Sequence, residues 1–154
     1  MIKTISLNKV EKNTFYFDDG KKKNLDLGGC RILCKYNDLC IKVGEQGKQE
    51  IEIFNSLEEW ELPFYAPIVE HGKTPWNMGD WDFPTKTTWV AQPWISRIIK
   101  TTKEEVFAAE YKQIWEATRQ RNLADIDYFQ HKGVWILHNW TVINGAPVCY
   151  DYGF

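Results

Sequence analysis

The chain has 154 residues, of which 44% are hydrophobic and 26% charged, and its formal net charge is −2. This is about one domain of ordinary globular composition, and the slightly acidic balance argues against general binding to nucleic acid or to anionic membranes. No stretch reaches the ~18 apolar residues that a membrane-spanning helix needs, and the first residues lack the apolar segment of a secretory signal. The four cysteines match no zinc spacing, so we expect reduced core cysteines in a cytoplasmic protein.

The first half of the chain predicts strands with one helix among them. Asn37-Asp38 lies between two apolar runs and is typical of a hairpin turn. Residues 48–60 predict a helix, because apolar residues recur there on one stripe. Residues 71–86 are rich in Gly, Pro, Asp and Trp and predict a long exposed loop. The strands are expected at residues 12–18, 31–36, 39–43, 67–70 and 87–92.

The second half predicts one long helix and a final hairpin. Residues 103–121 carry apolar side chains at helical spacing, and Thr102 with Glu105 forms a capping box in front of them. Asn144-Gly145 is a strong two-residue turn signal between strands expected at 141–143 and 147–150. The order of elements is not the regular alternation of a doubly wound sheet, and it predicts an α+β fold.

The end of the chain carries the most informative motif. Asn139 precedes Asp151 by twelve positions, and the predicted Asn144-Gly145 hairpin brings their side-chain oxygens together. Amide and carboxylate oxygens are ligands that Mg²⁺ accepts, and phosphoryl transfer needs Mg²⁺ to bridge the protein and the nucleotide phosphates. The predicted hairpin therefore offers Mg²⁺ an amide oxygen and a carboxylate oxygen.

A second pair of residues supports the same chemistry from the front half. Alternation along Leu39–Val43 places Cys40 and Lys42 on one face of a strand. Glu50 shares the apolar stripe of the following helix, where a carboxylate needs a cation. We therefore predict an ion pair between Lys42 and Glu50.

The order of these motifs resembles the protein-kinase fold, in the form of small phage-type protein-kinase-like proteins. Residues 139–153 are similar to their N-W-G-x-x-x-G-x-P-V-x-x-D-Y-G run, and Leu39-Cys40-Ile41-Lys42 is similar to the V-A-I-K strand of kinases. The resemblance spans residues 25–154. It implies one kinase-like domain over residues 1–154. Residues 1–95 would form an N-lobe-like antiparallel sheet with one helix, and 96–154 a truncated C-lobe-like part with one main helix and a β-hairpin.

The resemblance also implies roles for single residues around ATP and Mg²⁺. Lys42 and Glu50 would be the catalytic Lys–Glu pair, and Asn139 and Asp151 would hold the metal. The turn at Gly28-Gly29 would bind phosphate, and the segment around residues 92–95 would face adenine. The nucleotide-binding residues implied are Gly28, Gly29, Cys40, Lys42, Gln92 and Trp94.

The catalytic base departs from the family pattern. Related proteins place an Asp five residues before the metal-binding Asn, where this chain has Val134 within an apolar, strand-like run. Asp125 and Asp127 lie upstream, and either would serve only through a rearranged loop; of the two, Asp127 is the candidate base. Phe154 directly follows the D-Y-G triplet, so we expect no activation segment and no groove for a protein substrate.

Three functions stay open. The first is a weakly active or inactive pseudokinase that binds nucleotide and acts through a host or viral protein. The second is an active minimal ATP-dependent phosphotransferase. The third is an α+β domain whose kinase pattern arises by chance. For a protein partner, we expect contact through exposed aromatic residues of the loop at 71–86, namely Trp76, Trp81 and Phe83.

Overall fold

The computed structural model describes residues 5–23, 31–77, 84–95, 108–121, 127–131 and 134–152, and for residues 23, 127–131 and 134–138 it describes the backbone alone. The chain divides into two compact units. Unit 1 consists of Met1–Ile51 with Ile68–Trp94, and unit 2 of Glu52–Pro67 with Ile95–Phe154. Within the described ranges, no helix has both the length and the apolar character needed to cross a membrane.

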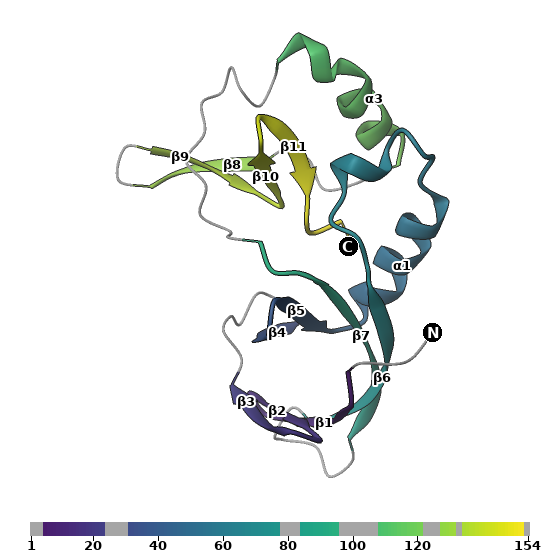
Figure 1. Cartoon of the computed structure of the whole chain (residues 1–154), viewed down its shortest axis with the longest axis vertical. Coiled ribbons are helices and arrows are strands. Elements are labelled where there is room, and N and C mark those ends of the chain that lie inside the picture. The colour runs from purple at the N-terminus through teal and green to yellow at the C-terminus, as the bar shows by residue number, and fades with distance from the viewer. Residues whose placement is uncertain are drawn as a thin grey trace. The chain divides into compact units, whose positions relative to one another are not determined.

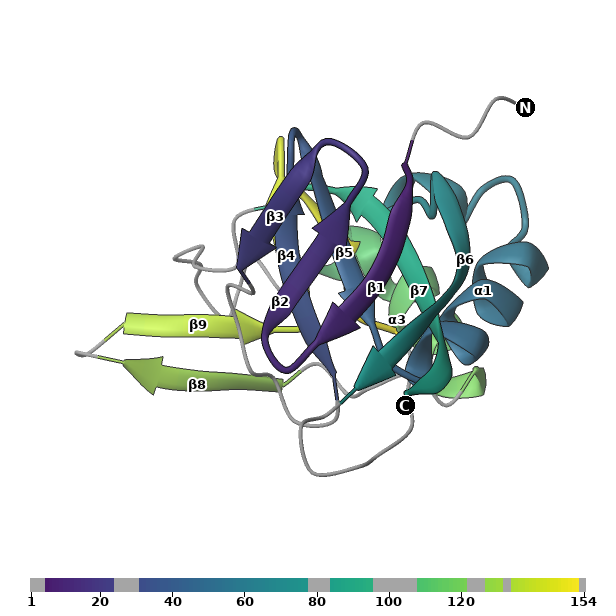
Figure 2. The ribbon, with the colours of Figure 1, turned by 90° about the horizontal axis from the view of Figure 1, so that it is seen from below.

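Unit 1 is built on a seven-stranded mixed sheet in the order β3-β2-β1-β6-β7-β5-β4 (Figure 1). Every neighbouring pair is antiparallel except β1 and β6, which run parallel. The sheet curls until the edge strands β3 and β4 approach each other, so that it is nearly closed, like a barrel (Figure 2). The strands are β1 (Leu7–Glu11), β2 (Thr14–Phe17), β3 (Gly20–Lys23), β4 (Ile32–Tyr36), β5 (Leu39–Val43), β6 (Glu70–Asn77) and β7 (Thr85–Pro93).

The two faces of the curled sheet have different chemistry. Side chains on the concave face form the hydrophobic core. Cys40, Lys42 and Gln92 lie on the opposite face, because they alternate with core residues along β5 and β7. This confirms the predicted alternation of β5. The buried core residues are Ile5, Val10, Phe15, Phe17, Ile32, Cys34, Ile41, Val43, Trp89 and Ala91.

Helix α1 (Gln46–Ser56) begins in unit 1 and packs closely on β7. A Cβ atom built on Gly47 would lie 3.0 Å from Thr88 Cγ2 and 3.4 Å from Val90 Cγ1. The helix therefore covers the face of the sheet that carries Lys42. It begins two residues before the predicted start at residue 48 and ends at Ser56 rather than at residue 60, because the chain turns there.

The β4–β5 hairpin confirms the turn predicted at Asn37-Asp38. Tyr36 pairs with Leu39 across the turn. Asn37 has φ 53°, a left-handed conformation that Asn tolerates better than most residues.

The expected loop at 71–86 is wrong for its first part, which forms strand β6 between β1 and β7. Gly72 is a packing residue here, since a Cβ at this position would lie 3.0 Å from ring atoms of Trp89. The strand expected at 67–70 is also wrong, because β6 begins only at Glu70. Trp76 is half-buried in β6 rather than exposed in a loop, and Trp81 and Phe83 lie outside the described residues.

The single strand predicted at residues 12–18 is also too simple. Lys12 has φ 53° and forms a turn, after which β2 pairs with β1 on one side and with β3 on the other. The Lys21-Lys22-Lys23 run hides β3 from the hydrophobic pattern. The three strands thus form a meander.

Unit 2 contains helix α3 and two hairpins. Its strands are β8 (Asp127–His131), β9 (Val134–His138), β10 (Trp140–Ile143) and β11 (Ala146–Cys149), and its helical elements are η1 (Leu62–Phe64), η2 (Ala109–Tyr111) and α3 (Lys112–Gln120). The continuous helix predicted at 103–121 is wrong at Ala108, whose φ of −52° and ψ of 133° are not helical. The capping box of Thr102 and Glu105 lies outside the described residues.

The β10–β11 hairpin confirms the prediction from Asn144-Gly145. Asn144 has φ 51° and Gly145 has φ 80°, as a type I′ turn requires. Asn and Gly are favoured at these positions because both tolerate a left-handed backbone.

An aromatic cluster forms the core of unit 2. The Trp140 ring centroid lies 5.2 Å from that of Trp115 and 5.9 Å from that of Tyr65. Tyr65 in turn meets the ring of Tyr152 edge-on at 5.7 Å. The fold is α+β, as predicted from the order of elements.

Candidate functional site

Glu50 is the centre of a buried ionic cluster in unit 1. Its side chain is fully buried, and its Oε2 accepts a hydrogen bond from Lys42 Nζ at 2.9 Å. Its other oxygen, Oε1, is bound by Arg31 NH1. Lys42 and Arg31 are themselves nearly inaccessible, with side-chain exposures of 6% and 9%. The predicted ion pair between Lys42 and Glu50 is therefore present, and a second cation joins it.

Strand register explains why two cations reach one carboxylate. Lys42 on β5 pairs with Leu33 on β4, so the two side chains share a face of the sheet. Arg31 lies two positions before Leu33, and the alternation of an extended chain gives it the same face. That face is the one covered by α1, from which Glu50 is presented.

The cluster keeps Glu50 ionised. Burial on its own raises the pKa of a carboxyl group, because it disfavours the charged form. The charges of Lys42 and Arg31 and their hydrogen bonds outweigh the burial, so the pKa of Glu50 lies below the usual glutamate range. The carboxylate is thus available as a fixed anchor for both cations.

The resemblance implies five other nucleotide-binding residues in unit 1. Two of them lie on the face of the sheet that carries Lys42, one follows β7, and two lie outside the described residues. Cys40 pairs with Gln92 across β5 and β7, so both lie on the face that carries Lys42. Trp94 follows β7; its backbone N–H donates to Asp38 O at 2.8 Å, and Lys35 Nζ lies 5.4 Å from its ring centroid. Gly28 and Gly29 lie outside the described residues.

Asn139 and Asp151 lie close together in the backbone of unit 2. Trp140 pairs with Cys149 at the open end of the β10–β11 hairpin, and Tyr150 N–H donates to Asn139 O at 3.0 Å. Asn139 is buried and has φ 64°, so the backbone turns sharply where β9 ends and β10 begins. The hairpin therefore brings Asn139 next to the residue that precedes Asp151.

The residue after Asp151 anchors this segment. Tyr152 is fully buried, and its hydroxyl donates to Ala66 O at 2.8 Å. Ala66 N–H donates to Cys149 O at 2.7 Å, which ties the same stretch to the end of β11. Asp151 itself is half-buried between these two fixed points.

The segment in which related kinase-like proteins carry the catalytic base forms strand β9 in this chain. Val134 begins β9, as the apolar run predicted, and β9 pairs with β8. In that pairing Asp127 lies opposite His138, the residue before Asn139. Asp125 lies outside the described residues.

Oxygen donors at Asn139 and Asp151 suit Mg²⁺ by their chemistry. Mg²⁺ is commonly held by one or two protein carboxylates, with water and substrate phosphates completing its shell. Among the described residues, no three or more His, Cys, Asp or Glu side chains gather into a metal-binding group.

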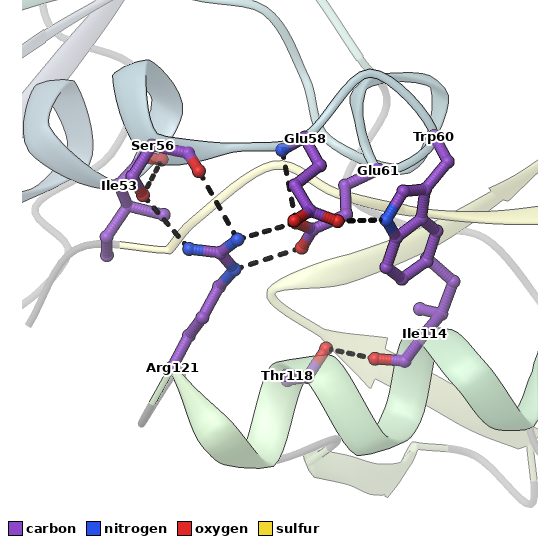
Figure 3. A network of polar contacts seen from close by, with 8 residues as sticks. All are labelled: Ile53, Ser56, Glu58, Trp60, Glu61, Ile114, Thr118 and Arg121. Carbon is purple, nitrogen blue, oxygen red and sulfur yellow. Dashed lines mark hydrogen bonds and ion pairs between the residues drawn. The ribbon is translucent and has the colours of Figure 1, made fainter.

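A second buried carboxylate, which the sequence did not indicate, lies in unit 2. Arg121 binds Glu61 through two nitrogens, with Nε–Oε2 at 2.9 Å and NH2–Oε1 at 2.5 Å (Figure 3). Glu61 also accepts the backbone N–H of Glu58 at 3.1 Å, and Arg121 NH1 donates to Ser56 Oγ at 3.0 Å. Burial favours the neutral acid, yet these donors hold the pKa of Glu61 below its usual range. The network joins the end of α1 to the end of α3 within unit 2.

Comparison with protein-family models, with curated proteins and with solved structures gave no match.

Proposed function

We propose that this chain is a minimal kinase-like protein that binds an adenine nucleotide with Mg²⁺ and acts through a host or viral protein partner rather than through fast phosphotransfer. The observation that carries the proposal is the buried Lys42–Glu50 ion pair, formed by a strand and the helix that follows it. Kinases use such a pair to hold the lysine that contacts the nucleotide phosphates.

The hairpin of unit 2 supports the metal-binding half of the proposal. Asn139 and Asp151 lie close in the backbone, and the aromatic cluster and the Tyr152–Ala66 hydrogen bond fix the segment around them. In this proposal their oxygens hold Mg²⁺, which neutralises phosphate charge. Lys42 binds phosphate oxygen, and Gln92 and Trp94 belong to the adenine-binding part.

Calorimetric titration with ATP, with and without Mg²⁺, tests this proposal. We expect weak binding that strengthens with Mg²⁺, and we expect Asp151→Ala to remove the Mg²⁺ dependence. The Glu59→Ala variant is the matched control, because it removes an exposed carboxylate of unit 2. Absence of binding at millimolar ATP, or a Mg²⁺ effect that survives in Asp151→Ala, contradicts the proposal.

The second candidate is an active minimal phosphotransferase. One observation favours it: the pairing of β8 with β9 brings the backbone of Asp127 opposite His138, next to Asn139. A carboxylate from this position would accept the proton of an attacking hydroxyl group. Val134 cannot do so, because its side chain has no proton acceptor.

A further inference from the structure

We propose that Arg31 is a positioning residue of the nucleotide site, which fixes the Glu50 carboxylate so that Glu50 holds Lys42 in place. The inference rests on the proposed nucleotide binding and names a residue that the motif did not include. Its basis is geometric: Arg31 binds Oε1 of the same carboxylate whose Oε2 binds Lys42.

A carboxylate held on one oxygen alone retains freedom to rotate about its terminal torsion, which is broad and nearly two-fold. With Arg31 on Oε1 and Lys42 on Oε2, the plane of the Glu50 carboxylate is fixed from strand β5 and from the residue before β4. Lys42 therefore meets an anchor of defined orientation.

Arg31 also matters when Lys42 contacts a phosphate. A phosphate oxygen competes with Glu50 for the lysine, and a buried carboxylate that loses its cation is strongly destabilised. Arg31 keeps Glu50 compensated at that moment, so helix α1 stays on the sheet. Lys42 then shares its donors with the nucleotide at lower cost.

The titration of Glu50 reports directly on whether Arg31 stabilises its carboxylate. Lys42 reaches it from β5 and Arg31 from the residue before β4. The nearby residues of β7, Thr88 and Val90, do not titrate. Since burial alone pushes the carboxyl toward its neutral form, removing one of the two cations raises its pKa.

The test follows two quantities in the full chain, the ¹³C NMR titration of the Glu50 carboxyl and the ATP affinity across a pH series with Mg²⁺ present. In Arg31→Met we expect Glu50 to titrate at higher pH than in the wild type. We expect ATP affinity to fall by about tenfold, the scale of one hydrogen bond between charged groups. As the pH is lowered, we also expect the variant to lose its remaining affinity at a higher pH than the wild type does. Arg31→Lys keeps the charge and is expected to restore both quantities most of the way.

Arg121→Met is the matched control, because it removes the other arginine that binds a buried glutamate. It is expected to lower stability while leaving the Glu50 titration and the ATP affinity unchanged. A Glu50 titration that does not move in Arg31→Met overturns the proposal, as does a shifted titration with unchanged ATP affinity at every pH. If Arg31→Met does not fold, Arg31→Lys is the deciding variant. ATP affinity equal to that of the wild type, falling at the same acid pH, supports the role. A loss of ATP affinity equal to that of Lys42→Met contradicts it. If the wild type binds no ATP, the proposed function fails together with the positioning role, and the nucleotide-free titration still shows whether Arg31 and Glu50 are coupled.

Discussion

At the scale of single residues, Glu50 is a fully buried carboxylate that binds two cations. A fully buried carboxylate is tolerated only when cations and hydrogen bonds replace the water it has lost. Two cations do so here, Lys42 from β5 and Arg31 from the residue before β4. Glu52, on the same helix but exposed, has no such requirement.

The lowered pKa of Glu50 predicts a specific pH dependence of stability. A carboxyl whose folded-state pKa is lowered stabilises the protein at pH values above its ordinary unfolded pKa. That stabilisation is lost as the pH falls through the lowered folded-state value. In urea unfolding at a series of pH values from neutral to acid, the wild type should lose stability in the acid range more steeply than Glu50→Gln.

Glu61 contributes to the same acid loss, because its pKa is lowered too. The Glu50→Gln variant should therefore keep part of the pH dependence rather than none. The Glu52→Ala variant serves as the control and should follow the wild-type curve. Parallel curves for the wild type and Glu50→Gln would show that Glu50 is not held ionised by its partners.

At the scale of elements, the β10–β11 hairpin shows how a turn fixes the candidate metal-binding segment. Asn144-Gly145 sets the register in which Trp140 faces Cys149, and that register brings Asn139 to Tyr150. A slip of one residue would move every side chain of the strand to the other face. The turn thus determines whether Asn139 and Asp151 are neighbours.

The turn leads to a prediction about Gly145. Its φ is 80°, and a Cβ there would contact nothing within 4 Å, so Gly145→Ala introduces backbone strain alone. The expected loss is about 1 kcal/mol of unfolding free energy, measured by urea denaturation. Gly145→Asn should lose less, because Asn tolerates a left-handed backbone. Equal stability of the Ala and Gly proteins would contradict the type I′ geometry.

Local signals predicted those elements that local chemistry determines. Asn37-Asp38 and Asn144-Gly145 lie at turns in the structure, and the helix predicted at 48–60 is present as far as Ser56. The strand expected at 87–92 lies within β7, whereas the loop expected at 71–86 was predicted wrongly in its first part, which forms β6. Gly72 suggested a loop, but it makes room for Trp89 in a strand, and no pattern within the sequence window reveals that neighbour.

The same division applies to the candidate site. The Lys42–Glu50 pair was predictable because the two residues are eight positions apart and the faces of one strand and one helix decide it. Arg31 is nineteen positions from Glu50, and Arg121 is sixty from Glu61. For Arg31 the signal was its position, two residues before the strand partner of Lys42. For Arg121 we find no signal in the sequence.

At the scale of the whole molecule, the candidate residues belong to different units. Lys42, Glu50 and Arg31 lie in unit 1, and Asn139, Asp151 and Asp127 in unit 2. Helix α1 contributes residues to both units, since Glu50 lies before its division point and Ser56 after it.

We expect turnover by the whole protein to be slow. Phosphotransfer moves the γ-phosphoryl group of ATP to a hydroxyl oxygen, leaving ADP, while a base accepts the hydroxyl proton. Such transfer depends chiefly on positioning and on neutralising phosphate charge, so Lys42 and Mg²⁺ alone would leave a slow reaction. A positioned base adds about 10²–10⁴-fold, and Val134 offers no proton acceptor. We therefore expect labelled ATP and generic substrates to give transfer slower by about that factor than a complete kinase site would give.

Asp127 decides between slow and efficient transfer. The β8–β9 pairing sets its backbone opposite His138, and residues directly opposite in an antiparallel pair have Cα atoms about 4.5–5.5 Å apart. If transfer is slow, Asp127→Asn should leave it unchanged, because no step depends on that carboxylate. Robust transfer that Asp127→Asn abolishes, while ATP binding persists, would contradict the slow-transfer prediction and make the chain an active phosphotransferase. Glu59→Ala controls for the loss of one negative charge, since Glu59 is exposed in the same unit.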